Sequence, residues 1–158
     1  MKKRQLLGAI LALVGGMAVA TAGEGADPVV GTWHLAASQS TFASGPALKD
    51  QTRIYERSGS KISLEMKSMT VDGKATSMKT TYQLDGKDYP VTGAPNYDAI
   101  SGKQLDSHTV DFVLSKNGKK MGTTTRTVSE DGKTLTVKTK VASASGEMMD
   151  QTLVFHKK

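Results

Sequence analysis

The feature that most constrains this fold is a turn pair that recurs along the chain, in which Asp or Asn is followed by Gly and then by Lys. Such pairs favour two-residue hairpins, because these turns need positive φ at both central positions. Runs rich in Thr, Val, Met, Leu and Tyr separate the pairs, and these residues suit a pleated surface. The pattern therefore predicts an antiparallel meander. The turns are Asp72-Gly73-Lys74, Asp85-Gly86-Lys87, Asn117-Gly118-Lys119 and Asp131-Gly132-Lys133, with Ser145-Gly146-Glu147 as a weaker fifth.

Between the turns, apolar and polar side chains alternate with a period of two, most clearly at 62–66 and 135–141. We expect eight to ten strands and no helix in the domain, apart from one helical turn in the polar loop 38–49. Pro90 confines the short strand 88–92 to a sheet edge or a strand end, because proline has no N–H to donate to a neighbouring strand.

Consecutive hairpins close most simply into an all-β, antiparallel up-and-down β-barrel, because closure removes the exposed sheet edges. A β-sandwich of the same strands is the alternative. The sequence contains no Cys, so no disulfide can crosslink the fold. Its stability must therefore come from the core and from closure of the sheet.

The start of the chain has the pattern of an export signal. A cationic start precedes the apolar run 6–20, and Ala20-Thr21-Ala22 fits a small-x-small cleavage site. The run is short for a membrane-spanning helix of roughly 20 residues, so we expect cleavage rather than anchoring. We predict a signal peptide at 1–22, a single domain at 23–158, and export to the periplasm or the medium.

Outside this signal, the charge is modest and dispersed. Removing residues 1–22 takes away three cationic and no acidic side chains, which lowers the formal net charge from +6 to +3. The remaining Lys residues form no basic stripe interleaved with aromatics, so we expect no nucleic-acid partner. The Lys-tipped turns are typical of solvated loops that discourage edge pairing.

No catalytic or metal-binding pattern is evident in the sequence. The chain has no Cys nucleophile, no Gly-x-Ser-x-Gly elbow and no paired-carboxylate motif. His34, His108 and His156 lie far apart in separate expected strands, so their spacing does not indicate a metal site. We therefore expect no enzyme activity, no metal and no cofactor. Any activity would be sought in the Asp- and Tyr-rich region 86–97.

The outward face distinguishes a soluble barrel from an outer-membrane one. A membrane barrel needs a continuous apolar band on its outside. Here Lys67, Lys79, Lys138 and Lys140 lie mid-strand, opposite the apolar face. We therefore expect a soluble, monomeric barrel that does not span a membrane after cleavage.

Three segments of the mature chain, taken together, resemble a bacterial family of exported, lipocalin-like proteins of unassigned function. They are Gly31-Thr32-Trp33, the segment 86–93 (GKDYPVTG) and the segment 126–136 (RTVSEDGKTLT). The first resembles the lipocalin Gly-x-Trp signature, and the meander resembles the wider calycin group, which includes fatty-acid-binding proteins. The resemblance implies that Trp33 lies across the closed end of a barrel, under an Arg from a late strand. Arg126 is the only Arg in the second half of the chain, so it is the candidate partner in this structural pair. A ligand-wall role for Trp33 is the alternative.

One face of the expected strands gathers apolar side chains that could line an interior. These are Met66, Met78, Tyr82, Phe112, Leu114, Leu135 and Val137, of which the first six are the predicted ligand-binding residues. With the family resemblance, this face predicts a barrel that binds a small apolar or amphipathic molecule, and flexible Met suits adaptable recognition. The alternative is an envelope protein-interaction module with a solid core and no small-molecule ligand.

Overall fold

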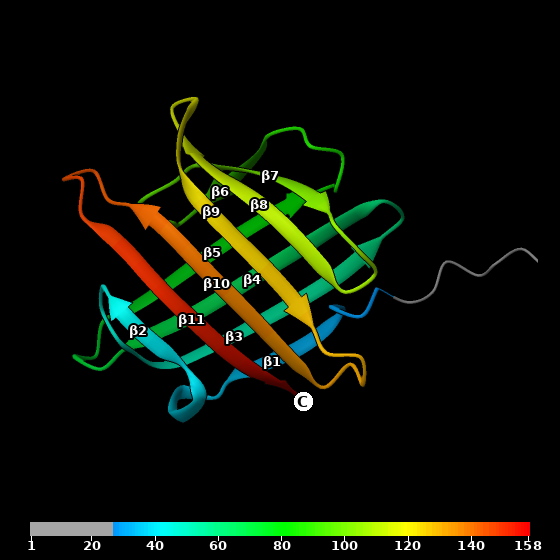
Figure 1. Ribbon diagram of the computed structural model, residues 1–158, viewed down its shortest axis with the longest axis horizontal. Helices are drawn as coiled ribbons and strands as arrows, with labels where there is room; N and C mark the ends of the chain where they lie inside the picture. The colour runs from blue at the N-terminus through cyan, green and yellow to red at the C-terminus, as the bar shows by residue number, and fades with distance from the viewer. Residues whose placement is uncertain (1–26) are drawn as a thin grey trace, which may run out of the picture.

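The structure is a computed structural model that describes residues 27–158, and the predicted signal peptide 1–22 lies outside the described residues. These residues form one antiparallel sheet of eleven strands that curves round on itself (Figure 1). The strands are β1 (Gly31–Leu35), β2 (Thr41–Ser44), β3 (Leu48–Ser58), β4 (Lys61–Thr70), β5 (Ala75–Tyr82), β6 (Tyr89–Thr92), β7 (Ala99–Gln104), β8 (Thr109–Lys116), β9 (Lys119–Val128), β10 (Thr134–Ala142) and β11 (Met148–Lys157).

Strand β1 closes the barrel, because it pairs with β3 on one side and with β11 on the other. The closed ring has ten strands, β1 and β3 to β11. After the 3₁₀ turn η1 (Ala37–Gln39), β2 pairs with β11 further along its length. In Figure 1, β9, β10 and β11 cross in front of β3, β4 and β5. The predicted barrel is confirmed.

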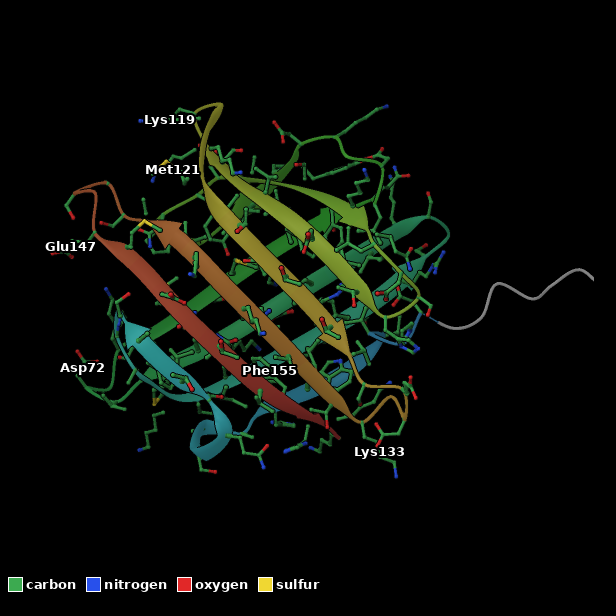
Figure 2. All side chains as sticks on the ribbon, in the orientation of Figure 1. Asp72, Lys119, Met121, Lys133, Glu147 and Phe155 are labelled. Carbon is green, nitrogen blue, oxygen red and sulfur yellow. The ribbon has the colours of Figure 1, made fainter. Side chains whose placement is uncertain are left out.

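The two ends of the barrel carry different segments, and we name each end by one residue. The Trp33 end carries residues 27–30 and the turns at 59–60, 105–108 and 129–133, whereas the Met148 end carries the turns at 71–74, 117–118 and 143–147. Figure 2 shows Asp72, Lys119 and Glu147 towards one end and Lys133 at the other.

The Asp-Gly, Asn-Gly and Ser-Gly pairs of the predicted turns all lie outside strands, but only one pair forms the predicted turn type. Asn117 and Gly118 have φ of 51° and 77°, as a two-residue hairpin with both central φ positive requires. In the Asp-Gly pairs only the glycine has positive φ. The aspartate instead accepts a local hydrogen bond, as where the Lys133 backbone N–H donates to Asp131 Oδ1 at 3.0 Å.

Two local expectations need correction. The stretch 38–49 does contain a helical turn, the end of η1, but it also holds β2, which the polar sequence conceals. Pro90 is the second residue of β6, which has neighbours on both sides, so of the two expected positions, a sheet edge or a strand end, the sheet edge is wrong. The carbonyl oxygen of Pro90 accepts a hydrogen bond from Thr80 Oγ1 at 2.9 Å, so a side chain bonds to β6 where proline cannot donate.

The core fills the barrel from the Trp33 end. Trp33 is fully buried and its indole Nε1–H donates to the Val29 carbonyl oxygen at 2.7 Å, which fixes the turn 27–30 against the barrel. Leu135, Leu153 and Phe155 are also fully buried. Within residues 27–158, no helix has the length and apolar character needed to cross a bilayer.

A methyl group at Gly122 has no room between β9 and β10. An ideal Cβ there would lie 1.9 Å from the Lys140 carbonyl oxygen and 2.6 Å from Val141 Cα. Because β10 is paired on both sides, its backbone cannot shift freely. We expect Gly122→Ala to lower the free energy of unfolding by about 3 kcal/mol, measured by urea denaturation with the fluorescence of the single Trp.

Gly73→Ala is the matched control for this variant. It adds the same methyl where no atom lies within 4 Å, at a φ of 86°. The expected loss is about 1 kcal/mol, from the left-handed conformation alone. Equal losses for the two variants would contradict the steric explanation.

Candidate ligand cavity

The barrel interior contains a small cavity, with a volume of about 60 Å³. Its walls combine aromatic rings, methionines and threonines with the guanidinium groups of Arg53 and Arg126. At roughly 10–15 Å³ for each water position, this volume holds about four to six water molecules. The interior is therefore neither solid nor large enough for a bulky ligand.

Most of the predicted ligand-binding residues lie on this cavity. The lining includes Met66, Met78, Tyr82, Phe112 and Leu114. Leu135 is fully buried but lies outside the lining, where Val137 from the same strand and face is found instead. The alternation pattern identified the inward face correctly, but it carries no information on the position of the cavity along the barrel axis.

Arg126 projects from β9 into this interior and is almost completely buried. Its Nη1–H donates to the Tyr82 hydroxyl at 2.8 Å, and its guanidinium lies 5.4 Å from the ring centre of Tyr55 and 5.6 Å from that of Phe112. The buried Nε has no hydrogen-bond partner. Aromatic faces and one neutral hydroxyl therefore hold a cation that keeps an unused donor.

Arg53 contributes a second cation from β3. Its Nε–H donates to Gln51 Oε1 at 2.8 Å, and its Nη1 lies 3.4 Å from the Tyr55 hydroxyl. The guanidinium lies 4.8 Å from the ring centre of Phe155. Sequence analysis missed Arg53 as a cavity residue, although it shares an inward face with Gln51 and Tyr55 at a spacing of two.

Neither arginine has a carboxylate partner within the described part of the chain. The ion pairs there join Lys67 and Lys79 to Glu65, and Lys140 to Asp150, through partly exposed side chains. Burial alone would lower the pKa of Arg126, but its interactions with Tyr82, Tyr55 and Asp27 outweigh this effect and raise the pKa above its usual value. Arg126 therefore remains charged, and the cavity wall is cationic.

The expected pairing of Trp33 with Arg126 is replaced by other contacts. The cation over the Trp33 ring is Lys157 Nζ, 5.2 Å from the ring centre, whereas Arg126 lies over Tyr55 and Phe112. Trp33 is absent from the cavity lining, so it has a structural position at its end of the barrel.

Further polar groups of the wall are already paired. Tyr97 donates its hydroxyl hydrogen to Met78 Sδ at 3.2 Å, and the hydroxyls of Thr124 and Thr139 lie 2.9 Å apart. No nucleophile with an adjacent base is present among these lining residues. The arrangement suits the binding of a small anion with an apolar part.

Two of the three histidines lie closer together than their sequence separation suggests. His34 and His156 face each other across the β1–β11 ladder, while His108 lies near the turn between β7 and β8. No group of three or more potential metal-ligating side chains of His, Cys, Asp or Glu occurs in residues 27–158.

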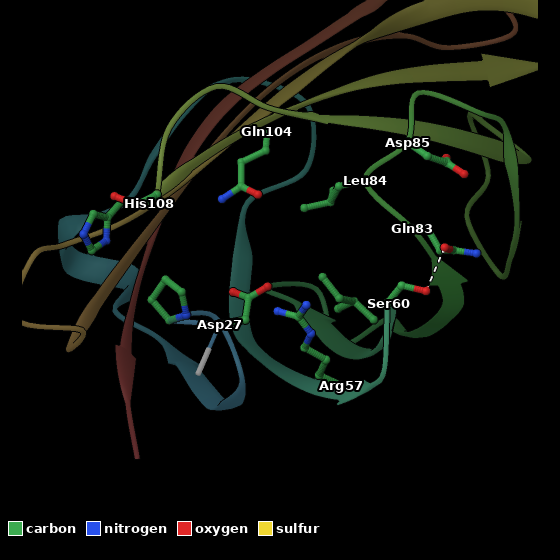
Figure 3. A pocket seen from close by; sticks show the side chains of 11 residues that line it. Asp27, Arg57, Ser60, Gln83, Leu84, Asp85, Gln104 and His108 are labelled. Atoms are coloured by element: carbon green, nitrogen blue, oxygen red, sulfur yellow. Dashed lines mark hydrogen bonds between the residues drawn. The ribbon is translucent and has the colours of Figure 1, made fainter. Parts of the chain in front are cut away.

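A second hollow opens at the Trp33 end, and we call it the end cleft (Figure 3). It is open to solvent and has a volume of about 620 Å³. Its lining includes Asp27, Arg57, Leu84, Gln104 and His108. The end cleft was not predicted, because its residues come from turns and strand ends that are distant in sequence.

No family model and no curated relative matches the chain. Solved structures resemble it at low sequence identity. Rv2717c from M. tuberculosis superposes with a TM-score of 0.55 at 13% identity, over 83% of this chain and 93% of that chain. EF1p2_mFAP2b bound to DFHBI gives a TM-score of 0.52 at 11% identity, over 83% of this chain and 94% of that chain.

A weaker similarity is to the siderocalin Ex-FABP, with a TM-score of 0.40 at 12% identity, over 83% of this chain and 74% of that chain. At such identities, the similarity to Rv2717c and EF1p2_mFAP2b supports the fold alone. The described chain is a closed antiparallel β-barrel of ten strands, as predicted.

The Tyr82–Arg126 contact predicts a particular response to alkaline pH. Burial raises the pKa of Tyr82 above its ordinary value of 10.0, by more than Arg126 lowers it. Above pH 10 the folded protein therefore retains a proton that the unfolded chain has lost, so stability falls as pH rises, by up to about 1.4 kcal/mol per pH unit.

Tyr82→Phe should flatten this alkaline decline in urea denaturation, with a smaller slope left by Tyr97, whose pKa burial also raises. At neutral pH the variant should be less stable by about 1–3 kcal/mol, because Arg126 Nη1 loses its partner. An unchanged alkaline slope in the variant would contradict the assignment to Tyr82.

Proposed function

We propose that this protein binds a small amphipathic anion, of the short-chain carboxylate type, inside the barrel. The observation that carries the proposal is the presence of two buried guanidinium groups, on Arg53 and Arg126, without a carboxylate partner in the described chain. A carboxylate between them would supply the missing countercharge.

Energetics favour a binding role over a purely structural one. A buried cation without a counterion is costly, and well-packed hydrophobic residues of similar volume are often neutral or stabilising replacements. A barrel that needed only a core would be better served at these positions by Met or Leu. The apolar neighbours Met66, Met78 and Leu114 complete a wall suited to a short hydrocarbon tail.

The size of the cavity limits the ligand. Pockets for drug-sized molecules usually measure about 300–1,000 Å³, and this cavity is far smaller. We therefore assign it a ligand of about half a dozen non-hydrogen atoms, which replaces the four to six waters that the space admits. The solved complex of EF1p2_mFAP2b with DFHBI supports ligand binding by such a fold, without bearing on which ligand is bound here.

We further propose that the protein acts as a binding protein outside the cytoplasm. The predicted signal at 1–22 supports export, and a cavity wall without a nucleophile–base pair supports binding rather than catalysis. Exposed lysines on the strands, such as Lys67 and Lys79, support a soluble barrel.

Butyrate and its neutral isostere butyramide provide the test. The natural protein should prefer butyrate by about tenfold to a hundredfold, because a charge-assisted hydrogen bond contributes about 1.5–3 kcal/mol. The preference is measured by NMR titration of the backbone amides that surround the cavity. Equal binding of the two probes would contradict the proposal.

The double variant Arg126→Met with Tyr82→Phe separates function from stability. It removes the cation together with its hydrogen-bond partner, so no polar group of the pair is left unsatisfied. We expect the preference for butyrate to disappear while the free energy of unfolding rises by about 1–3 kcal/mol. A variant that is less stable than the natural protein and still prefers butyrate would show that Arg126 has a structural role only.

A further inference from the structure

We propose that Leu84 is the gate between the cavity and the end cleft, and that it sets the length of the ligand that the cavity accepts. This inference rests on the proposed internal site. It adds a route by which a ligand passes between the cavity and the end cleft. It also adds a limit on ligand length, which the lining of the cavity does not by itself provide.

The cavity and the end cleft occupy neighbouring layers of the same barrel interior. On β3 and β4, the cleft residues Arg57 and Ile62 each lie two positions from a cavity residue, Tyr55 and Leu64 respectively. Residues two apart in a strand share a face, so the two hollows are separated by about one layer of side chains. Leu84 follows the cavity residue Tyr82 by two positions and lines the end cleft.

A missing side chain on β7 makes the space that Leu84 occupies. A Cβ built on Gly102 would lie 2.8 Å from Leu84 Cδ2 and 2.8 Å from Phe112 Cε1. Leu84 and the cavity residue Phe112 therefore meet over the bare backbone of Gly102. Tyr82 packs edge-on against Phe112, with 5.3 Å between the two ring centres. Figure 3 shows Leu84 projecting into the end cleft.

The backbone that carries Leu84 is weakly held. β5 ends at Tyr82 and β6 begins at Tyr89, so residues 83–88 belong to no strand. The link to β7 is the hydrogen bond from the Gly86 N–H to the Gly102 carbonyl oxygen, at 3.1 Å. A segment with few backbone bonds opens locally at low free-energy cost, so Leu84 can move without unfolding of the barrel.

An opened gate would join the cavity to a much larger space. The end cleft measures about 620 Å³, against about 60 Å³ for the cavity. A carboxylate held by Arg126 could then extend a longer tail past Ile62 and Pro28, which are apolar residues of the cleft lining. With the gate closed, Leu84 blocks that tail.

The decisive measurement compares butyrate and octanoate binding to the full mature protein and to Leu84→Ala. We expect Leu84→Ala to raise the octanoate-to-butyrate affinity ratio by about tenfold or more, because additional methylenes leave water. Leu105→Ala is the matched control, since Leu105 is 56% exposed and lines neither hollow.

A second readout needs no ligand. Removal of the Leu84 side chain should admit water towards Tyr82 and lower its pKa towards the ordinary value, as followed by NMR of labelled tyrosine. Leu105→Ala should leave that pKa unchanged. Met66→Ala tests the opposite direction. If this variant, and not Leu84→Ala, raises the octanoate-to-butyrate affinity ratio, the hydrocarbon tail of octanoate extends towards the Met148 end and the gate assignment is wrong.

The outcomes also separate this inference from the proposed function. Binding of butyrate with an unchanged octanoate ratio and an unchanged Tyr82 pKa in Leu84→Ala would overturn the gate alone. A lowered Tyr82 pKa without binding of either carboxylate would support the physical partition and overturn the proposed ligand class.

Discussion

The pairing of β1 with both β3 and β11 is the constraint on which the rest of this structure depends. Without it, β3 and β11 would be open edges and the inward residues would face water. Trp33 lies at the centre of this closure, opposite Arg53 on one side and Lys157 on the other. Because side chains alternate across a strand, the register of this seam determines which residues of β3 and β11 enter the interior. Arg53 is one of them, so the position of a cavity cation follows from closure of the barrel.

The two interior arginines show how such a barrel can hold charge without ion pairs. Each guanidinium lies over aromatic rings and contacts a tyrosine hydroxyl, which are weaker partners than a carboxylate. These contacts offset part of the desolvation of the cation but leave it without a carboxylate in ion-pair contact. The unpaired Nε of Arg126 locates this deficit at one atom. An incoming anion would therefore gain the interaction that the protein itself does not supply, so the same deficit reduces stability and favours binding.

Sequence periodicity predicted what depends on neighbours along the chain and missed what depends on closure. The Asn117-Gly118 hairpin, the barrel class and most of the inward face follow from turn chemistry and alternation. Whether an inward residue meets empty space or solid core depends on residues opposite it across the barrel, so alternation could not show that Leu135 lies outside the cavity lining. The predicted partner of Arg126 was wrong, because the resemblance to lipocalins supplied Trp33 and no local pattern could supply Tyr55, Tyr82 or Phe112.

Ligand entry and structural stability depend on different parts of the barrel. β10 pairs with β11 along its whole length, from Thr134 to Ala142, whereas β6 meets β5 only at Lys79 and Thr80. A closed barrel with a buried site must open somewhere for a ligand to enter, and the opening costs least where the fewest backbone bonds break. The short ladder of β6 and the segment 83–88, which belongs to no strand, form that place.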